Sequence, residues 1–176
     1  MQNISSLKDI PVAYKNTPIE SLIKYHNFGE KFTEYPNARL LVGMCMDNRK
    51  KLNIPENFAF VLRTGGVNLR ANEFHISFAI SVGKIKHIAL IGHNNCGMVN
   101  LHTKKEQFIT GLTNTCDWES NTAEEHFHSY APILEISDSV DFTLNEVIRL
   151  RMKYPNIIIA PMMYIVEDRK LYFIDE

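Results

Sequence analysis

The sequence predicts an α/β fold with a central, mainly parallel sheet flanked by helices. Short and almost wholly apolar runs recur along the chain, which is typical of strands that are buried on both faces. Segments with apolar residues at helical spacing separate these runs, and this alternation favours a parallel sheet. At 176 residues the chain can bury about two-thirds of its unfolded surface, so we expect one domain over residues 1–176.

The first 36 residues are expected to form an N-terminal helical arm. Ile19, Leu22 and Ile23 follow Pro18 at helical spacing, which predicts one short amphipathic helix. The arm contains too few apolar residues to make a core of its own. We expect residues 1–36 to pack on the main body or on a partner subunit, and we therefore predict a homodimer or a larger homo-oligomer.

Apolar runs predict four buried strands, at residues 39–44, 57–62, 87–92 and 157–160. Between the second and third of them, Asn72 can cap a helix that ends at Gly83. The face of this helix that is expected to be buried consists of Phe74, Phe78, Ala79 and Val82.

Two further helices and a hairpin are predicted in the second half of the chain. Cys96-Gly97 is expected to open a helix that runs to about residue 110, and a capping box over residues 143–146 is expected to begin another. Residues 111–140 show no clear pattern. Residues 163–174 are typical of a closing hairpin at a sheet edge.

The composition argues against several classes of function. A net charge of −1 gives no field that would attract nucleic acid or an anionic membrane surface. The longest mostly apolar run, at residues 157–166, is too short to span a bilayer, and the first residues carry no secretory signal pattern. Three cysteines favour a reducing cytoplasm over a disulfide framework. We expect a cytoplasmic protein with neither nucleic-acid nor membrane partners.

Two short motifs each follow a predicted buried strand: Cys45-Met46-Asp47-Asn48-Arg49 and His93-Asn94-Asn95-Cys96-Gly97. Ligands of parallel sheets collect where the strands end, so these motifs are expected to meet at one edge. Zinc prefers thiolate and imidazole ligands, and its catalytic sites often keep one position open. Cys96 should also ionise more easily at the start of the predicted helix.

Taken singly, each cysteine is more simply explained as a small buried residue, and His93 as a hydrogen-bonded loop residue. The combination favours a zinc ion (Zn²⁺) held by Cys45, His93 and Cys96. Asp47 and Arg49 stand at the same edge, where charged groups are rarely buried without a partner or a task.

The double motif resembles the signature of the β-class carbonic anhydrases, over about residues 37–110 and more loosely over residues 141–174. The resemblance implies that Cys45, His93 and Cys96 hold zinc and that Asp47 pairs with Arg49. It also implies that zinc-bound hydroxide attacks carbon dioxide to give bicarbonate, with Asp47 orienting the hydroxide. In some members of the family the matching aspartate becomes a fourth zinc ligand and closes the site.

The chain departs from the family pattern beside the expected site. Many relatives have Asn-Ala-Gly where this chain has Thr64-Gly65-Gly66, and Thr-Asp where it has Asn94-Asn95. Gly65 and Gly66 are expected to line the substrate pocket, because glycine lets the backbone approach a ligand closely. These departures leave the choice of substrate open.

Two alternatives therefore stand beside carbon dioxide hydration. Hydrolases of carbon disulfide or carbonyl sulfide resemble the same family and use the same zinc ligands. A non-catalytic, zinc-stabilised bicarbonate-binding relative is the other alternative, although a purely structural site would not need Asp47 and Arg49.

Overall fold

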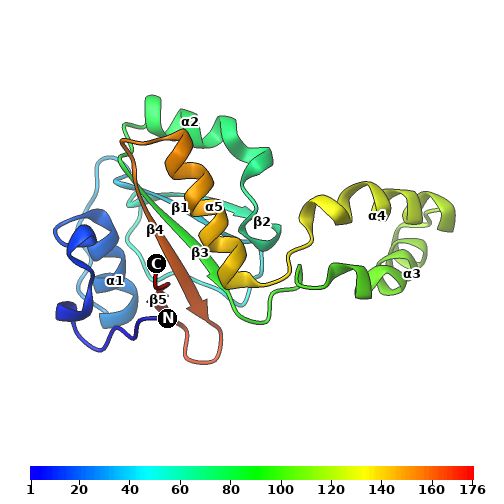
Figure 1. The fold of residues 1–176 in the computed structure, drawn as a ribbon, viewed down its shortest axis with the longest axis horizontal. Coiled ribbons are helices and arrows are strands. Elements are labelled where there is room, and N and C mark those ends of the chain that lie inside the picture. Colours follow the sequence, from blue (N-terminus) through cyan, green and yellow to red (C-terminus); the bar gives the residue numbers. More distant parts are fainter.

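A five-stranded sheet in the order β2-β1-β3-β4-β5 forms the centre of the computed structural model, which describes residues 1–176 (Figure 1). Four strands pair in parallel: β1 (Leu40–Cys45), β2 (Ala59–Thr64), β3 (His87–His93) and β4 (Ile158–Ile165). The last strand, β5 (Lys170–Phe173), runs antiparallel to β4 at the sheet edge. The predicted α/β fold and the closing edge hairpin are confirmed.

Helices cover both faces of this sheet. Successive strand residues point to opposite faces, so a strand covered on both sides reads as a continuous apolar run. Helix α1 (Pro18–Phe28) packs on one face, in a core shared with β1, β3 and β4. Helices α2 (Glu73–Ser81) and α5 (Ser139–Lys153) pack on the other face.

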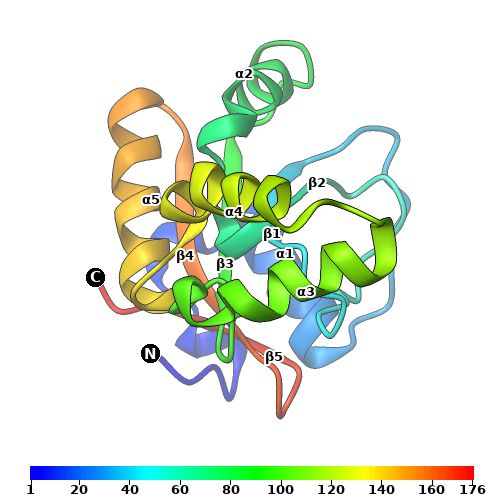
Figure 2. The ribbon, with the colours of Figure 1, turned by 90° about the vertical axis from the view of Figure 1, so that its right-hand side faces the viewer.

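Two helices form a hairpin that stands out from this body. The pair consists of α3 (Lys105–Cys116) and α4 (Ser120–Leu134), and it occupies most of residues 111–140, which show no clear pattern in the sequence. Figures 1 and 2 show the hairpin projecting beyond the edge at which β3 ends. Short 3-10 turns occupy Leu7–Asp9, Val12–Tyr14, Gly65–Val67, Arg70–Asn72 and Leu101–Lys104. None of the helices combines the length and the apolar character needed to cross a membrane.

Two predicted buried faces are wrong. The strand expected at residues 57–62 is β2, which lies at the open edge of the sheet, and its Phe60 and Val61 are exposed. On α2, Ile76 and Ala79 face the core, whereas the exposed fractions of Phe74, Phe78 and Val82 are 76%, 50% and 61%. Apolar side chains of α2 point to all sides of the helix, so their spacing in the sequence could not indicate which face packs on the core.

Two predicted helix starts are also wrong. Cys96-Gly97 opens a turn, and the α-helix begins only at Lys105, so the expected help from a helix N-terminus to the Cys96 thiol does not exist. Helix α5 begins before the expected capping box, because the Asp138 side chain accepts hydrogen bonds from two main-chain N–H groups of its first turn. Thr143 lies inside the helix, where its hydroxyl donates to the carbonyl of Ser139.

The N-terminal arm packs on its own sheet. Thr17 caps α1, Pro18 occupies the first turn, and Ile19, Leu22 and Ile23 are fully buried in the core beneath the sheet. Of the two alternatives expected for the arm, packing on the main body and packing on a partner subunit, the structure shows the first for α1. Because the apolar face of α1 is covered within its own chain, this helix no longer motivates a partner subunit, and the homo-oligomer stays a prediction.

Tyr14 ties the arm to the end of the chain and gives the fold an alkaline pH dependence. Its hydroxyl donates to Glu176 at 3.2 Å and accepts from Arg151 at 3.3 Å. Burial, followed by the negative charge of Glu176, raises the pKa of Tyr14 to about 12. A tyrosine in the unfolded chain has a pKa of about 10, so the unfolded state loses its proton first. The folded state therefore loses stability as the pH rises from about 10 towards about 12.

Replacing Tyr14 with Phe is expected to flatten this pH dependence. The slope of the free energy of unfolding against pH should differ between the two proteins by up to about 1.4 kcal/mol per pH unit, which corresponds to one proton. Denaturant unfolding of the wild type and of Tyr14→Phe at several pH values above about 10 measures it. Tyr130→Phe, on an exposed side chain of α4, is the control and should keep the wild-type slope. Equal slopes for wild type and Tyr14→Phe would contradict the assignment.

Candidate metal centre

Strand order brings the two cysteines and the histidine of the motifs together. Cys45 ends β1, His93 ends the neighbouring parallel strand β3, and Cys96 follows in the turn after β3. One potential ligand atom from each lies within 4.8 Å of the others, and all three residues are buried. The two sulfur atoms are 4.0 Å apart, too far for a disulfide bond. The sequence prediction that this trio meets at one sheet edge is confirmed.

The histidine is oriented as a metal ligand would be. Its Nδ1 lies 2.8 Å from the main-chain oxygen of Asn94, which accepts a hydrogen bond from it. This hydrogen bond leaves Nε2 as the acceptor, and Nε2 is buried without any hydrogen-bond partner. An unpartnered buried acceptor beside two thiols is explained by a cation, and metal-bound histidines typically donate their other ring N–H to a carbonyl or carboxylate in this way.

The two thiols share a hydrogen bond. A hydrogen bond from Cys96 lowers the pKa of the Cys45 thiol well below its usual range, and the same bond together with burial raises the pKa of Cys96. Main-chain N–H groups of Asp47 and Gly66 lower the pKa of Cys45 further. A bound dication would favour the ionised form of both thiols.

Asp47 and Arg49 form a multidentate ion pair beside the trio. The guanidinium Nη2 lies 2.6 Å from Asp47 Oδ2, and Nε lies 3.1 Å from both carboxylate oxygens. These bonds hold the pKa of the Asp47 carboxyl far below its usual range, so it is ionised at neutral pH. Arg49 Nη2 also donates to the carbonyl of Asn95 at 2.9 Å, which links the two motifs.

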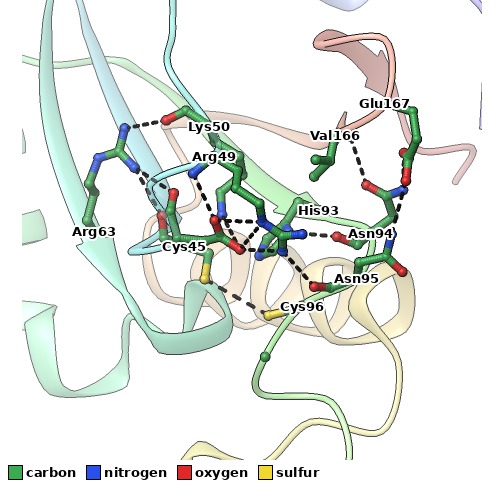
Figure 3. A network of polar contacts seen from close by, with 12 residues as sticks. Cys45, Arg49, Lys50, Arg63, His93, Asn94, Asn95, Cys96, Val166 and Glu167 are labelled. Atoms are coloured by element: carbon green, nitrogen blue, oxygen red, sulfur yellow. Dashed lines mark hydrogen bonds and ion pairs between the residues drawn. The ribbon is translucent and has the colours of Figure 1, made fainter.

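Two residues that the sequence analysis did not single out fix the motif loops (Figure 3). Arg63, on β2, donates to the carbonyls of Cys45 at 3.3 Å and Lys50 at 3.0 Å. Glu167, in the turn after β4, accepts from the side chains of Asn94 and Asn95. Both stand near the carboxyl ends of strands that flank the site, so the rule that located the motifs could also have pointed to them.

Gly65 and Gly66 lie in the turn that follows β2, next to the trio. A Cβ at Gly65 would lie 3.1 Å from the Met98 sulfur, and Gly66 has φ +61° with Met98 and Ile136 equally close. Glycine is therefore needed here for close packing and a left-handed backbone. Their expected role in lining the substrate pocket stays a prediction.

Comparisons with known proteins bear on the fold and the family. A family model described as carbonic anhydrase matches residues 41–168. A β-carbonic anhydrase, isoform I, from the protozoan Trichomonas vaginalis is similar in structure, with a TM-score of 0.64 and 19% identity over 82% of this chain and 86% of that one.

Two more solved structures are similar to this chain. A carbonic anhydrase from Glaciozyma antarctica has a TM-score of 0.62 and 20% identity over 94% of this chain and 100% of that one. The apo form of a carbon disulfide hydrolase has a TM-score of 0.56 and 22% identity over 78% of each chain. A search of curated proteins gave no match. At these identities the structural likeness supports the fold alone.

Proposed function

Because the matched family model spans residues 41–168, this chain belongs to the carbonic anhydrase family, and we propose that it is a zinc enzyme that interconverts carbon dioxide and bicarbonate. The observation that carries the proposal is the buried Cys45–His93–Cys96 trio with the Asp47–Arg49 ion pair beside it. A purely structural zinc site is closed by four protein ligands and needs no such pair.

Cys45 and Cys96 would hold zinc through their sulfur atoms and His93 through Nε2. When bound, zinc would supply the Lewis-acid chemistry that activates water at neutral pH. The three residues offer one ligand atom each, and catalytic zinc sites with three protein ligands keep a further position for water or substrate.

Asp47 would orient the attacking water. Its carboxylate is ionised, is an acceptor only, and has lone pairs left beyond those that Arg49 occupies. By accepting a hydrogen bond from the water, Asp47 would turn a lone pair of the water oxygen towards the carbon of carbon dioxide. Arg49 would keep the carboxylate in place, so that Asp47 does not become the fourth metal ligand.

Hydrolysis of carbon disulfide or carbonyl sulfide is the second candidate reaction. A carbon disulfide hydrolase is among the proteins with this fold, and the trio would serve either substrate. An apolar cavity of about 320 Å³ between α3 and α4 is also lined by Met98, the side chain that packs on Gly65 and Gly66. Apolar surroundings near the site suit any of these linear, uncharged molecules.

Parallel assays on protein loaded with zinc to about one ion per chain decide between the reactions. Stopped-flow measurement of carbon dioxide hydration, between about pH 6.5 and 9, is expected to show turnover. Release of sulfide from carbon disulfide and carbonyl sulfide is measured on the same preparation. Sulfide release without carbon dioxide hydration would favour the second reaction, and inactivity in all assays would overturn the proposal of an enzyme.

A further inference from the structure

Lys50 is a buried lysine beside the trio. The residue is 1% exposed, and its Nζ has no hydrogen-bond partner. Its ion-pair partner is Asp47, whose Oδ2 lies 3.9 Å away, at the limit of an ion pair. Lysines are almost never fully buried unless they are paired, because removing an ammonium from water is costly. A buried, weakly paired ammonium therefore calls for a physical reason.

The backbone of Lys50 is fixed so that its side chain points inward. Its N–H donates to the carbonyl of Asp47 at 3.4 Å, and its carbonyl accepts from Arg63 at 3.0 Å (Figure 3). The preceding residue, Arg49, points the other way, and 46% of its side chain is exposed. Asp47 is thus flanked by two cations, one on the solvent side and one on the buried side.

The charges around Lys50 are those of the metal centre. Burial lowers the pKa of the Lys50 ammonium, while the negative charges of Cys45, Asp47 and Cys96 raise it. Arg63 is the other cation that acts on it and lowers its pKa. The buried ammonium therefore lies within electrostatic reach of both thiols as well as of the carboxylate.

A charge count around the loaded centre shows what this ammonium does. A bound divalent ion and two thiolates would cancel, His93 would be neutral, and Asp47 would cancel Arg49. The charges of Lys50 and Arg63 would remain, and that of Lys50 lies in a buried region where charges are poorly screened. A monovalent anion at the open position would therefore be attracted by this buried positive charge.

We propose that Lys50 is a positioning and specificity-determining residue, a fixed positive charge that favours a monovalent anion at the open position of the Cys45–His93–Cys96 site. It also holds the Asp47 carboxylate from the buried side, opposite Arg49. The inference rests on the proposed function insofar as it assumes a metal ion at the trio. It does not require that the anion be bicarbonate.

Thiocyanate is a suitable probe, because its binding can be measured by calorimetry without any catalytic turnover. In zinc-loaded protein, Lys50→Met keeps a long side chain and removes the charge. We expect thiocyanate to bind about 30- to 100-fold more weakly, as for a charge lost at about 6–8 Å under an effective dielectric constant of about 20. The zinc content of each sample is measured alongside.

Lys51→Met is the matched control, because Lys51 is the adjacent lysine and is exposed. It makes the same change in net charge and should keep the wild-type thiocyanate affinity. Lys50→Arg keeps the charge and should stay within about threefold of wild type, whereas Lys50→Gln is a second neutral variant if Lys50→Met does not fold.

Thermal unfolding of the metal-free variants separates charge from packing. An imperfectly paired buried ion is readily replaced by an apolar side chain, so Lys50→Met should unfold at or above the wild-type midpoint. Unchanged thiocyanate affinity in the neutral variants would overturn the proposal, as would the absence of thiocyanate binding to the wild type. If the wild type does not hydrate carbon dioxide but the neutral variants still bind thiocyanate more weakly, the proposed function fails and this inference stands.

Discussion

Exchanging either Cys45 or Cys96 for serine is expected to reduce the zinc content of the purified protein from about one ion per chain to nearly none. One potential ligand atom from each of Cys45, His93 and Cys96 lies within 4.8 Å of the others, so each change removes one of three protein ligands. Serine has the same shape and is slightly smaller, but its hydroxyl is a poor zinc ligand. If the affinity is shared among the ligands, losing one should weaken binding by about 10²- to 10³-fold.

Cys116→Ser is the control for this experiment. Cys116 is the third cysteine of the chain, and it is exposed at the end of α3. Its replacement should leave the zinc content and affinity unchanged, which rules out general thiol effects during purification. Zinc is measured by elemental analysis after dialysis and by competition with a chromophoric chelator. Wild-type zinc affinity in both Cys45→Ser and Cys96→Ser would contradict the metal centre.

The trio was predictable because it depends on one general rule. Cys45 and His93 each end an apolar run, and parallel strands bring such ends to one edge of a sheet. The prediction required only that the two strands be neighbours in the sheet, and β1 and β3 are neighbours. The ion pair was equally predictable from the sequence, since Asp47 and Arg49 are separated by a single residue.

The rest of the site depends on strand order and loop conformation, which local patterns do not encode. Lys50 and Lys51 are identical in type and adjacent, and only the loop held by Arg63 decides which of them is buried. Glu167 reaches Asn94 and Asn95 only because β4 pairs with β3. Similarly, Phe60 is exposed because β2 is an edge strand, and an apolar run alone does not reveal an edge.

Exchanging Asp47 for asparagine is expected to lower kcat for carbon dioxide hydration by about 10²- to 10⁴-fold while zinc is retained. Asparagine keeps the shape of the side chain but loses the negative charge that the Arg49 guanidinium now contacts through two nitrogen atoms. The water would lose its fixed acceptor, and Arg49 would be left without its partner. Glu56→Gln, at an exposed carboxylate, is the control and should keep the wild-type rate.

Arg49→Ala and the double variant Asp47→Asn/Arg49→Ala complete the test. If Arg49 acts by holding Asp47, its loss costs nothing further once the carboxylate has gone, so the double variant should be about as slow as Asp47→Asn alone. The zinc content of the variants shows whether Asp47 orients water or binds the metal. If Asp47 only orients water, it can be replaced without loss of zinc. Rate losses that multiply in the double variant would mean that the two side chains act independently, and the ion pair would then not be the unit that the geometry indicates.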